Sequence, residues 1–188
     1  MTTNKIYDLF GDLSDGEEFN SDDAALRVMQ AGYDDLLSQR DWYFLDKSVE
    51  LTLDDLSLPV DFDNVLRVWY KDSAGNVSSS PLIRTSFANR YDVSADYYVD
   101  EVTKKIVLIN SFSSGSLIVD YKHKPAALTL DDECEPIFSS TFHPLLALYM
   151  KKQFKSADEN YDFYKETGID FADLEQRMID DDAKRKIQ

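Results

Sequence analysis

The spacing of apolar residues predicts two helices in the first forty residues. Near the start, four apolar residues at helical spacing predict a short amphipathic helix, which Gly11 and Gly16 weaken. They are Ile6, Leu9, Phe10 and Leu13. Ser21 is a favourable N-cap residue, and the two aspartates after it lie in the first turn, where the helix dipole favours negative charge. An apolar stripe follows and predicts a helix that runs to about Arg40.

The middle of the chain has the pattern of strands. Residues 48–53 alternate apolar and polar side chains, and residues 65–70 form a second run that ends at the turn sequence 73–76. Three further β-branched and aromatic runs, separated by polar turns, predict an antiparallel meander. They are residues 96–100, 104–109 and 115–121. We expect the helices to cover this meander.

Two stretches have a less regular pattern. The aromatic cluster at residues 41–45 could stack on bases or anchor a core, and its acidic neighbours favour the core anchor. Residues 82–95 show no period, so we expect a long excursion from the sheet. Such loops often carry contacts to partners.

The last third of the chain predicts two more helices. A broad apolar face begins near Pro136 or Thr141 and continues to Gly168, which is well placed as a C-terminal cap. Asp170 can cap a final helix with a narrow apolar stripe, which gains little by packing on its own domain. The stripe consists of Phe171, Leu174, Met178 and Ile179. The expected fold is therefore α+β: helices packed around a small antiparallel β-meander, with a C-terminal helical arm. We expect an acidic segment at 1–20, a domain at 21–168 and the arm at 169–188.

Charge narrows the classes of function. The chain of 188 residues has 20 Lys and Arg against 36 Asp and Glu, a net charge of −16. Such a surface repels phosphate backbones, so we expect no sequence-specific binding of nucleic acid. It suits a basic protein partner or a surface that must not hold DNA, and solubility alone explains it equally well.

The sequence contains no motif of catalysis. The chain has one cysteine, Cys134, and two histidines, His123 and His143, to which we assign structural roles. A loop of four acidic residues could suggest a metal site, but it lacks the glycine and the closing glutamate of a calcium loop. The four are Asp131, Asp132, Glu133 and Glu135, and we expect them to be solvated or to contact a partner. We expect no metal, no cofactor and no enzyme activity.

No apolar run has the length of a signal peptide or a membrane span. We therefore expect a soluble protein that is made in the cytoplasm and does not bind membranes.

The order of these parts resembles the head-to-tail adaptor proteins, also called connector or neck proteins, of tailed bacteriophages. The resemblance rests on short pieces in sequence from about residue 6 to 165. They are the capped helix with Arg40-Asp41-Trp42-Tyr43-Phe44, Val49-Glu50-Leu51-Thr52-Leu53, Leu58-Pro59-Val60-Asp61-Phe62, Val65-Leu66-Arg67-Val68, Asp96-Tyr97-Tyr98-Val99, Leu117-Ile118-Val119-Asp120-Tyr121, Lys124-Pro125, the acidic loop, and Phe142-His143-Pro144-Leu145-Leu146. The acidic amino terminus and residues 82–95 depart from the family's pattern.

The resemblance implies a structural virion protein that is made in the host cytoplasm and assembles in the neck, between capsid and tail. It would form a ring by self-association and bind the portal protein and a tail or further neck protein. Our candidate residues for portal docking, by a helix-in-groove contact, are Phe171, Leu174, Met178 and Ile179. The alternative hypothesis is a small acidic inhibitor or immunity-type protein that binds a basic enzyme, suggested by the net charge and the acidic loop.

Overall fold

Helices and strands gather in two separate units of the chain. A computed structural model describes residues 1–14, 16, 18–130, 133–155 and 161–186, with only the backbone of 155 and 161–166. Residues 1–44 and 126–188 form the helical unit, and residues 45–125 form the strand unit. The predicted α+β class is confirmed. The predicted boundaries at residues 20 and 168 do not coincide with the limits of the two units.

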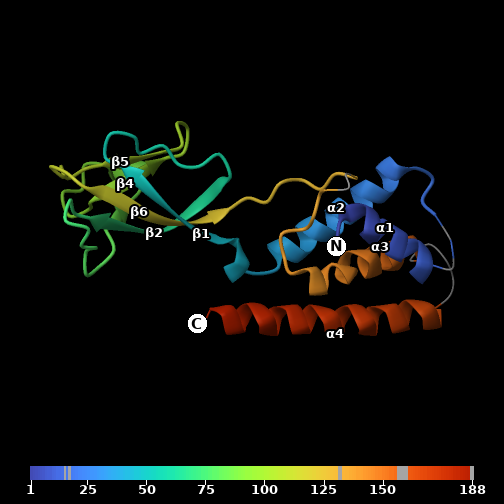
Figure 1. The fold of residues 1–188 in the computed structure, drawn as a ribbon. Coiled ribbons are helices and arrows are strands. Elements are labelled where there is room, and N and C mark those ends of the chain that lie inside the picture. Colours follow the sequence, from blue (N-terminus) through green and yellow to red (C-terminus); the bar gives the residue numbers. More distant parts are fainter. Residues whose placement is uncertain (15, 17, 131–132, 156–160, 187–188) are drawn as a thin grey trace. The chain divides into compact units, whose positions relative to one another are not determined.

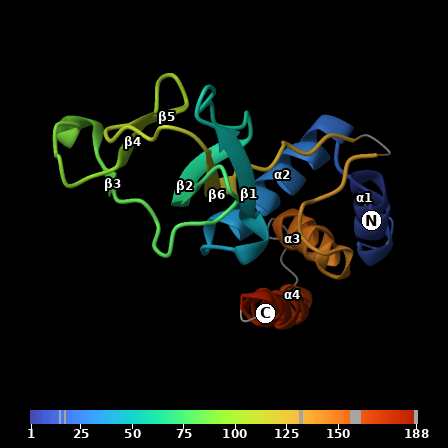
Figure 2. The ribbon, with the colours of Figure 1, turned by 60° about the vertical axis from the view of Figure 1, so that its left-hand side comes forward.

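The helical unit is arranged around α3 (Pro144–Lys155). This helix contacts α1 (Thr3–Leu13), α2 (Asp22–Ser38) and α4 (Tyr161–Arg185), as Figures 1 and 2 show. The first two helices lie where the apolar spacing predicts them. Ser21 caps α2 as expected, since its hydroxyl accepts a hydrogen bond of 3.2 Å from the Ala24 N–H.

The core of the helical unit combines helix faces with the aromatic cluster. Gly32 on α2 allows close packing on α3, because a Cβ at this position would lie 2.6 Å from the Tyr149 ring. Trp42 is fully buried, and its Nε1–H donates to the Leu36 carbonyl at 2.8 Å. The predicted core anchor is therefore confirmed for Trp42, whereas Tyr43 next to it is exposed.

The predicted end of a helix at Gly168 is wrong. α4 runs without a break from Tyr161 to Arg185 and passes through this glycine. A glycine in a helix costs only about 1 kcal/mol relative to alanine, which packing on either side can offset. Phe171 and Met178 are 8% and 2% exposed, so α4 packs on its own unit, contrary to our expectation for this helix.

The strand unit contains two three-stranded sheets. In the first, β6 (Ser116–His123) lies between β1 (Asp46–Thr52) and β2 (Phe62–Lys71), with antiparallel pairing on both sides. In the second, β4 (Tyr97–Asp100) lies between β3 (Arg84–Thr85), which is parallel to it, and β5 (Lys105–Leu108), which is antiparallel.

The predicted meander is therefore wrong, although its three strands exist. β4 and β5 form a hairpin, but β6 leaves them and pairs with β1 and β2. Gly115 precedes β6 with φ of +120°, and its missing side chain leaves room for the Lys71 carbonyl of β2. Six of the eight residues of β6 are buried, as is typical of a central strand.

The two sheets enclose one apolar core. Val68, Leu117 and Val119 contribute from the first sheet, and Tyr97 and Ile106 from the second. The core consists of strand-unit residues, so the sheets cover each other where we expected helices to cover a meander.

Candidate interaction surfaces

The predicted portal-docking residues divide into two groups on α4. Phe171 and Met178 are buried within the helical unit, where the Phe171 ring lies 6.3 Å from that of Tyr149. Leu174 and Ile179 are half-buried and leave part of their side chains exposed. Only these two of the four residues offer apolar atoms to a partner in this conformation.

Asp182 near the end of α4 is a structural residue that we did not predict. The residue is 4% exposed, and its carboxylate accepts hydrogen bonds from the N–H groups of Tyr43 (2.9 and 3.1 Å) and Phe44 (3.2 Å). It therefore anchors the segment after α2 to α4. Its neighbours Asp180 and Asp181 are solvent-accessible and bond within the helix, to Gln176 and Arg185. The helical phase of Asp182, four residues after the buried Met178, was the signal that could have identified it.

The acidic loop is only partly described. Asp131 and Asp132 lie outside the described residues, and Glu133 is exposed. Glu135 accepts a hydrogen bond of 3.0 Å from the Met1 amino group, and this bond lowers the pKa of the Glu135 carboxyl. Nearby, the His143 ring is buried, with its nitrogens 2.6 Å from the Met1 carbonyl and 2.9 Å from the Phe138 carbonyl. Glu135 and His143 thus have partners within the helical unit.

The described residues contain no arrangement that suggests a metal site. Among them, no group of three His, Cys, Asp or Glu side chains could hold a metal ion. His123, the other histidine, is buried at the end of β6, with Nδ1 2.9 Å from the Leu45 carbonyl. In the described part of the chain, no helix combines the length and the apolar composition that a membrane span requires.

Most of the predicted excursion at residues 82–95 lies in a closed and internally bonded segment, residues 83–96, here called the excursion loop. Its ends are joined by hydrogen bonds of 2.8 Å from the Ile83 N–H to the Asp96 carboxylate and from the Asp96 N–H to the Ile83 carbonyl. Further bonds within it hold Asn89 to Ser86 and Asp92 to Asn89. Close ends and internal bonds are the features of a compact Ω-loop.

The excursion loop presents apolar side chains to solvent. Four of them have large exposed fractions: Ile83 59%, Phe87 57%, Tyr91 80% and Val93 87%. The Arg90 guanidinium lies between two of the rings, 4.4 Å from the Phe87 centroid and 4.7 Å from that of Tyr91. Arg90 forms no ion pair with any described residue, so its charge is available to a partner.

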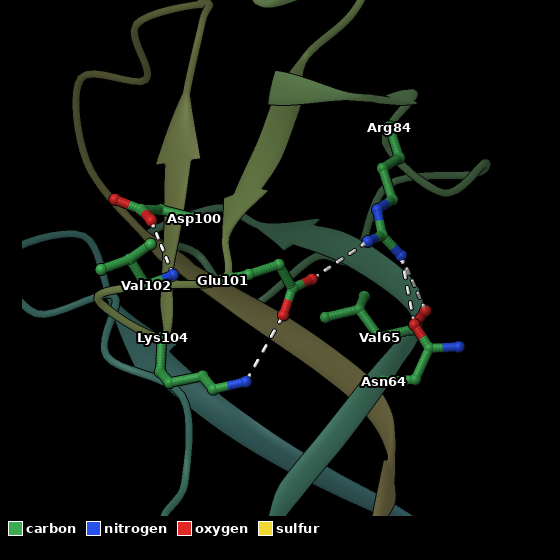
Figure 3. Close-up of polar contacts among 7 residues, drawn as sticks. All are labelled: Asn64, Val65, Arg84, Asp100, Glu101, Val102 and Lys104. Carbon is green, nitrogen blue, oxygen red and sulfur yellow. Dashed lines mark hydrogen bonds and ion pairs between the residues drawn. The ribbon is translucent and has the colours of Figure 1, made fainter. Parts of the chain in front are cut away.

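A polar network supports the base of this loop. Arg84 of β3 donates to Asn64 Oδ1 and to the Val65 carbonyl on β2, both at 3.4 Å, and lies 3.7 Å from Glu101 (Figure 3). Glu101 also pairs with Lys104 at 3.4 Å in the turn between β4 and β5. β3 is therefore attached to both sheets, which holds the excursion loop in place.

The helical unit has an acidic hollow beside α1, here called the α1 hollow. It is lined by Tyr7, Asp8, Phe10, Gly11, Asp12, Gly16 and Glu18. Three of these residues are acidic and none is basic. Burial, followed by the charges of Asp22 and Glu18, raises the pKa of the Tyr7 hydroxyl. A Cβ on Gly11 or Gly16 would meet no described side chain within 4 Å, so there is space beside both glycines.

Charge is unevenly divided between the two units. The strand unit has 9 Lys and Arg against 12 Asp and Glu, a net charge of −3. The helical unit has 11 against 24, a net charge of −13. The excursion loop carries Arg84 and Arg90 against Asp92 and Asp96 and is therefore neutral, so it is free of the negative charge that dominates the helical unit.

The model of the SU10 adaptor protein family matches residues 4–187, which is nearly the whole chain. A search of curated proteins found no match.

Proposed function

The chain belongs to the SU10 adaptor protein family, and from this membership we propose that it forms a ring between the portal and the tail. It is thus a structural adaptor protein of a bacteriophage and a component of the virion, and its family is one of structural proteins. Adaptors of this kind interact with portal and tail proteins. The match over residues 4–187 is the observation that carries the proposal, and it favours the adaptor over an acidic inhibitor of an enzyme.

The charge of the chain supports a position beside a DNA channel. A wall of net negative charge repels the phosphate backbone, so DNA slides past it without binding. The helical unit, with a net charge of −13, is the part of the chain that suits this wall. The neck of the virion is the location that follows from the proposal.

We propose α4 as the contact to the portal, with Leu174 and Ile179 as its partner-facing residues. Both are half-buried and can add apolar contact when a partner groove covers them. Phe171 and Met178 support this contact indirectly, because their buried side chains hold α4 in position on the helical unit. Deletion of residues 169–188 would remove this internal packing together with the contact surface, so substitution is the better test.

The proposal is tested by native mass spectrometry of the protein with and without the portal protein encoded beside it. We expect a stoichiometric ring complex that appears when the portal is added. Leu174→Ser with Ile179→Ser should abolish the complex and leave the helical content unchanged. Gln176→Ser, an exposed change on the same helix, is the matched control and should bind as the wild type does. A wild-type chain that stays monomeric with the portal contradicts the ring.

A further inference from the structure

The excursion loop and the α1 hollow have complementary chemistry. The loop offers exposed aromatic rings around a cation without an ionic partner, whereas the hollow offers an acidic rim around aromatic walls. An arginine bound by a carboxylate and a ring packed against rings are both favourable when water is excluded.

We propose that the excursion loop of one copy docks in the α1 hollow of the next copy, and that this contact builds the ring. This inference rests on the proposed function and names the two surfaces through which neighbouring copies would join in the ring. Arg90 faces the carboxylates of Asp8, Asp12 and Glu18, and the rings of Phe87 and Tyr91 pack against the half-buried Tyr7.

Exposure on the isolated chain supports this use of the loop. Tyr91 and Val93 are at least 80% exposed, although large apolar side chains gain free energy by burial. Several large apolar side chains exposed on one short loop are typical of an interaction site. The loop is also held by its own hydrogen bonds and by the Arg84 network, so docking requires little further ordering.

Charge complementarity identifies the partner as a second copy of this chain. The hollow lies in a unit of net charge −13, and its described lining includes three acidic residues and no basic one. Arg90 lies against the exposed rings of Phe87 and Tyr91 and has no ion pair among the described residues. Each chain therefore carries both halves of the contact.

A contact of this kind fits a ring, which forms when the rotation between neighbouring copies closes, whereas a rotation that does not close gives a filament. The loop and the hollow are different surfaces, so each copy uses one surface on one neighbour and the other surface on the other neighbour. A head-to-tail contact of this kind repeats until the rotation closes it. A symmetric dimer, by contrast, would use the same patch on both copies.

Complementation between two defective variants tests the contact. We expect Arg90→Asp and Asp12→Arg each to weaken assembly by about tenfold or more, as is usual for a charged residue at the centre of an interface. In a ring where the two variants alternate, there are two kinds of contact. In one, the loop with Arg90→Asp meets the hollow with Asp12→Arg, so both charges are reversed; in the other, the original Arg90 loop meets the original Asp12 hollow. At positions 90 and 12 every contact then joins opposite charges, while Asp8 and Glu18 are the same in both variants. An equimolar mixture should therefore assemble, with equal numbers of both variants in the ring.

Charge-matched controls are available on both units. Arg67→Asp changes an exposed arginine of β2, and Asp35→Arg changes an exposed aspartate of α2. Both should assemble as the wild type does. Tyr91→Ser with Val93→Ser removes only exposed side chains, so this variant should remain folded and lose assembly. Gly11→Tyr should also block assembly, because its side chain fills the hollow without a clash at Cβ.

Two readouts separate the outcomes. Native mass spectrometry with the portal counts copies per complex, and sedimentation velocity of the concentrated protein alone measures self-association. Assembly of both single variants as in the wild type overturns the inference and leaves the ring intact. If a chain that carries both Arg90→Asp and Asp12→Arg assembles but the mixture of the single variants does not, the loop and the hollow meet within one chain. This result also overturns the inference. Self-association that depends on Arg90, without a portal complex, supports the contact and contradicts the proposed function. A wild type that assembles in neither measurement refutes both.

Discussion

Replacement of Asp182 by alanine should destabilise the helical unit much more than the same change at its two neighbours. The three aspartates are consecutive in the sequence, but only Asp182 is buried and accepts backbone hydrogen bonds from Tyr43 and Phe44. Its removal leaves two partly buried N–H groups without an acceptor.

The magnitude follows from these bonds. Hydrogen bonds to a charged group contribute about 1.5–3 kcal/mol each, and partial burial favours the lower end of this range. We therefore expect Asp182→Ala to lower the free energy of unfolding by about 2–4 kcal/mol. Asp182→Asn keeps one acceptor oxygen and should lose about half of that. Asp180→Ala and Asp181→Ala remove only accessible contacts and should each change stability by at most about 0.5 kcal/mol.

Urea unfolding followed by the fluorescence of Trp42 measures this effect. The chain has two tryptophans, and Trp69→Phe leaves Trp42, which is buried in the helical unit, as the reporter. With a slope of about 2 kcal/mol per M, Asp182→Ala should lower the urea midpoint by about 1–2 M. A midpoint that shifts no more than those of Asp180→Ala and Asp181→Ala would refute the anchoring role of Asp182.

Three further predictions concern the glycines and the strand unit. Gly32→Ala should destabilise the helical unit by about 1–3 kcal/mol, because the new Cβ lies 2.6 Å from the Tyr149 ring; an unchanged urea midpoint would contradict this packing. Gly168→Ala should stabilise the same unit by about 1 kcal/mol, since the position is in mid-helix with open space around it; a loss of stability would contradict a continuous α4. In the strand unit, hydrogen bonds from Lys71 and Lys47 lower the pKa values of Glu50 and Asp61. Their stabilisation is complete above the ordinary carboxyl pKa values of 4.5 and 3.8 and is lost as the pH falls through the lower folded values. Urea titrations followed by the NMR signals of β6 at pH 6, 4 and 3 should show this decline, and equal midpoints at all three values would count against it.

Local signals in the sequence were sufficient where a structure depends on near neighbours. Ser21 and the stripe after it predict α2 correctly, because capping and helical periodicity act within a few residues. The burial of Trp42 was also predictable, since a large aromatic residue among acidic neighbours has no other favourable environment.

Long-range pairing was not predictable from the same signals. β5 and β6 are consecutive and both apolar, but β6 pairs with β1, about seventy residues earlier in the chain. Nothing in residues 104–121 alone distinguishes a meander from a central strand of another sheet. The prediction that a helix ends at Gly168 was wrong for a related reason. Packing of Phe171 and Met178 outweighs the weak local preference of glycine for a helix end.

The candidate surfaces show the same division. The excursion loop was predicted as a place for partner contacts because residues 82–95 lack periodicity. Its sandwich of Arg90 between two rings required coordinates. The α1 hollow was missed, because Gly11 and Gly16 were considered only as residues that weaken a helix.

The strand unit interrupts the helical unit in the sequence, and this has a consequence for biosynthesis. Residues 45–125 are contiguous and their two ends meet, since Asp46 pairs with Lys122 across β1 and β6. This part can therefore fold on the ribosome as soon as it emerges. α1 and α2 are made before the strand unit, but α3, the helix on which both pack, is synthesised only after it. The newly made chain is thus most in need of chaperones during translation of the strand unit, and its amino-terminal helices are the segments that a chaperone would hold.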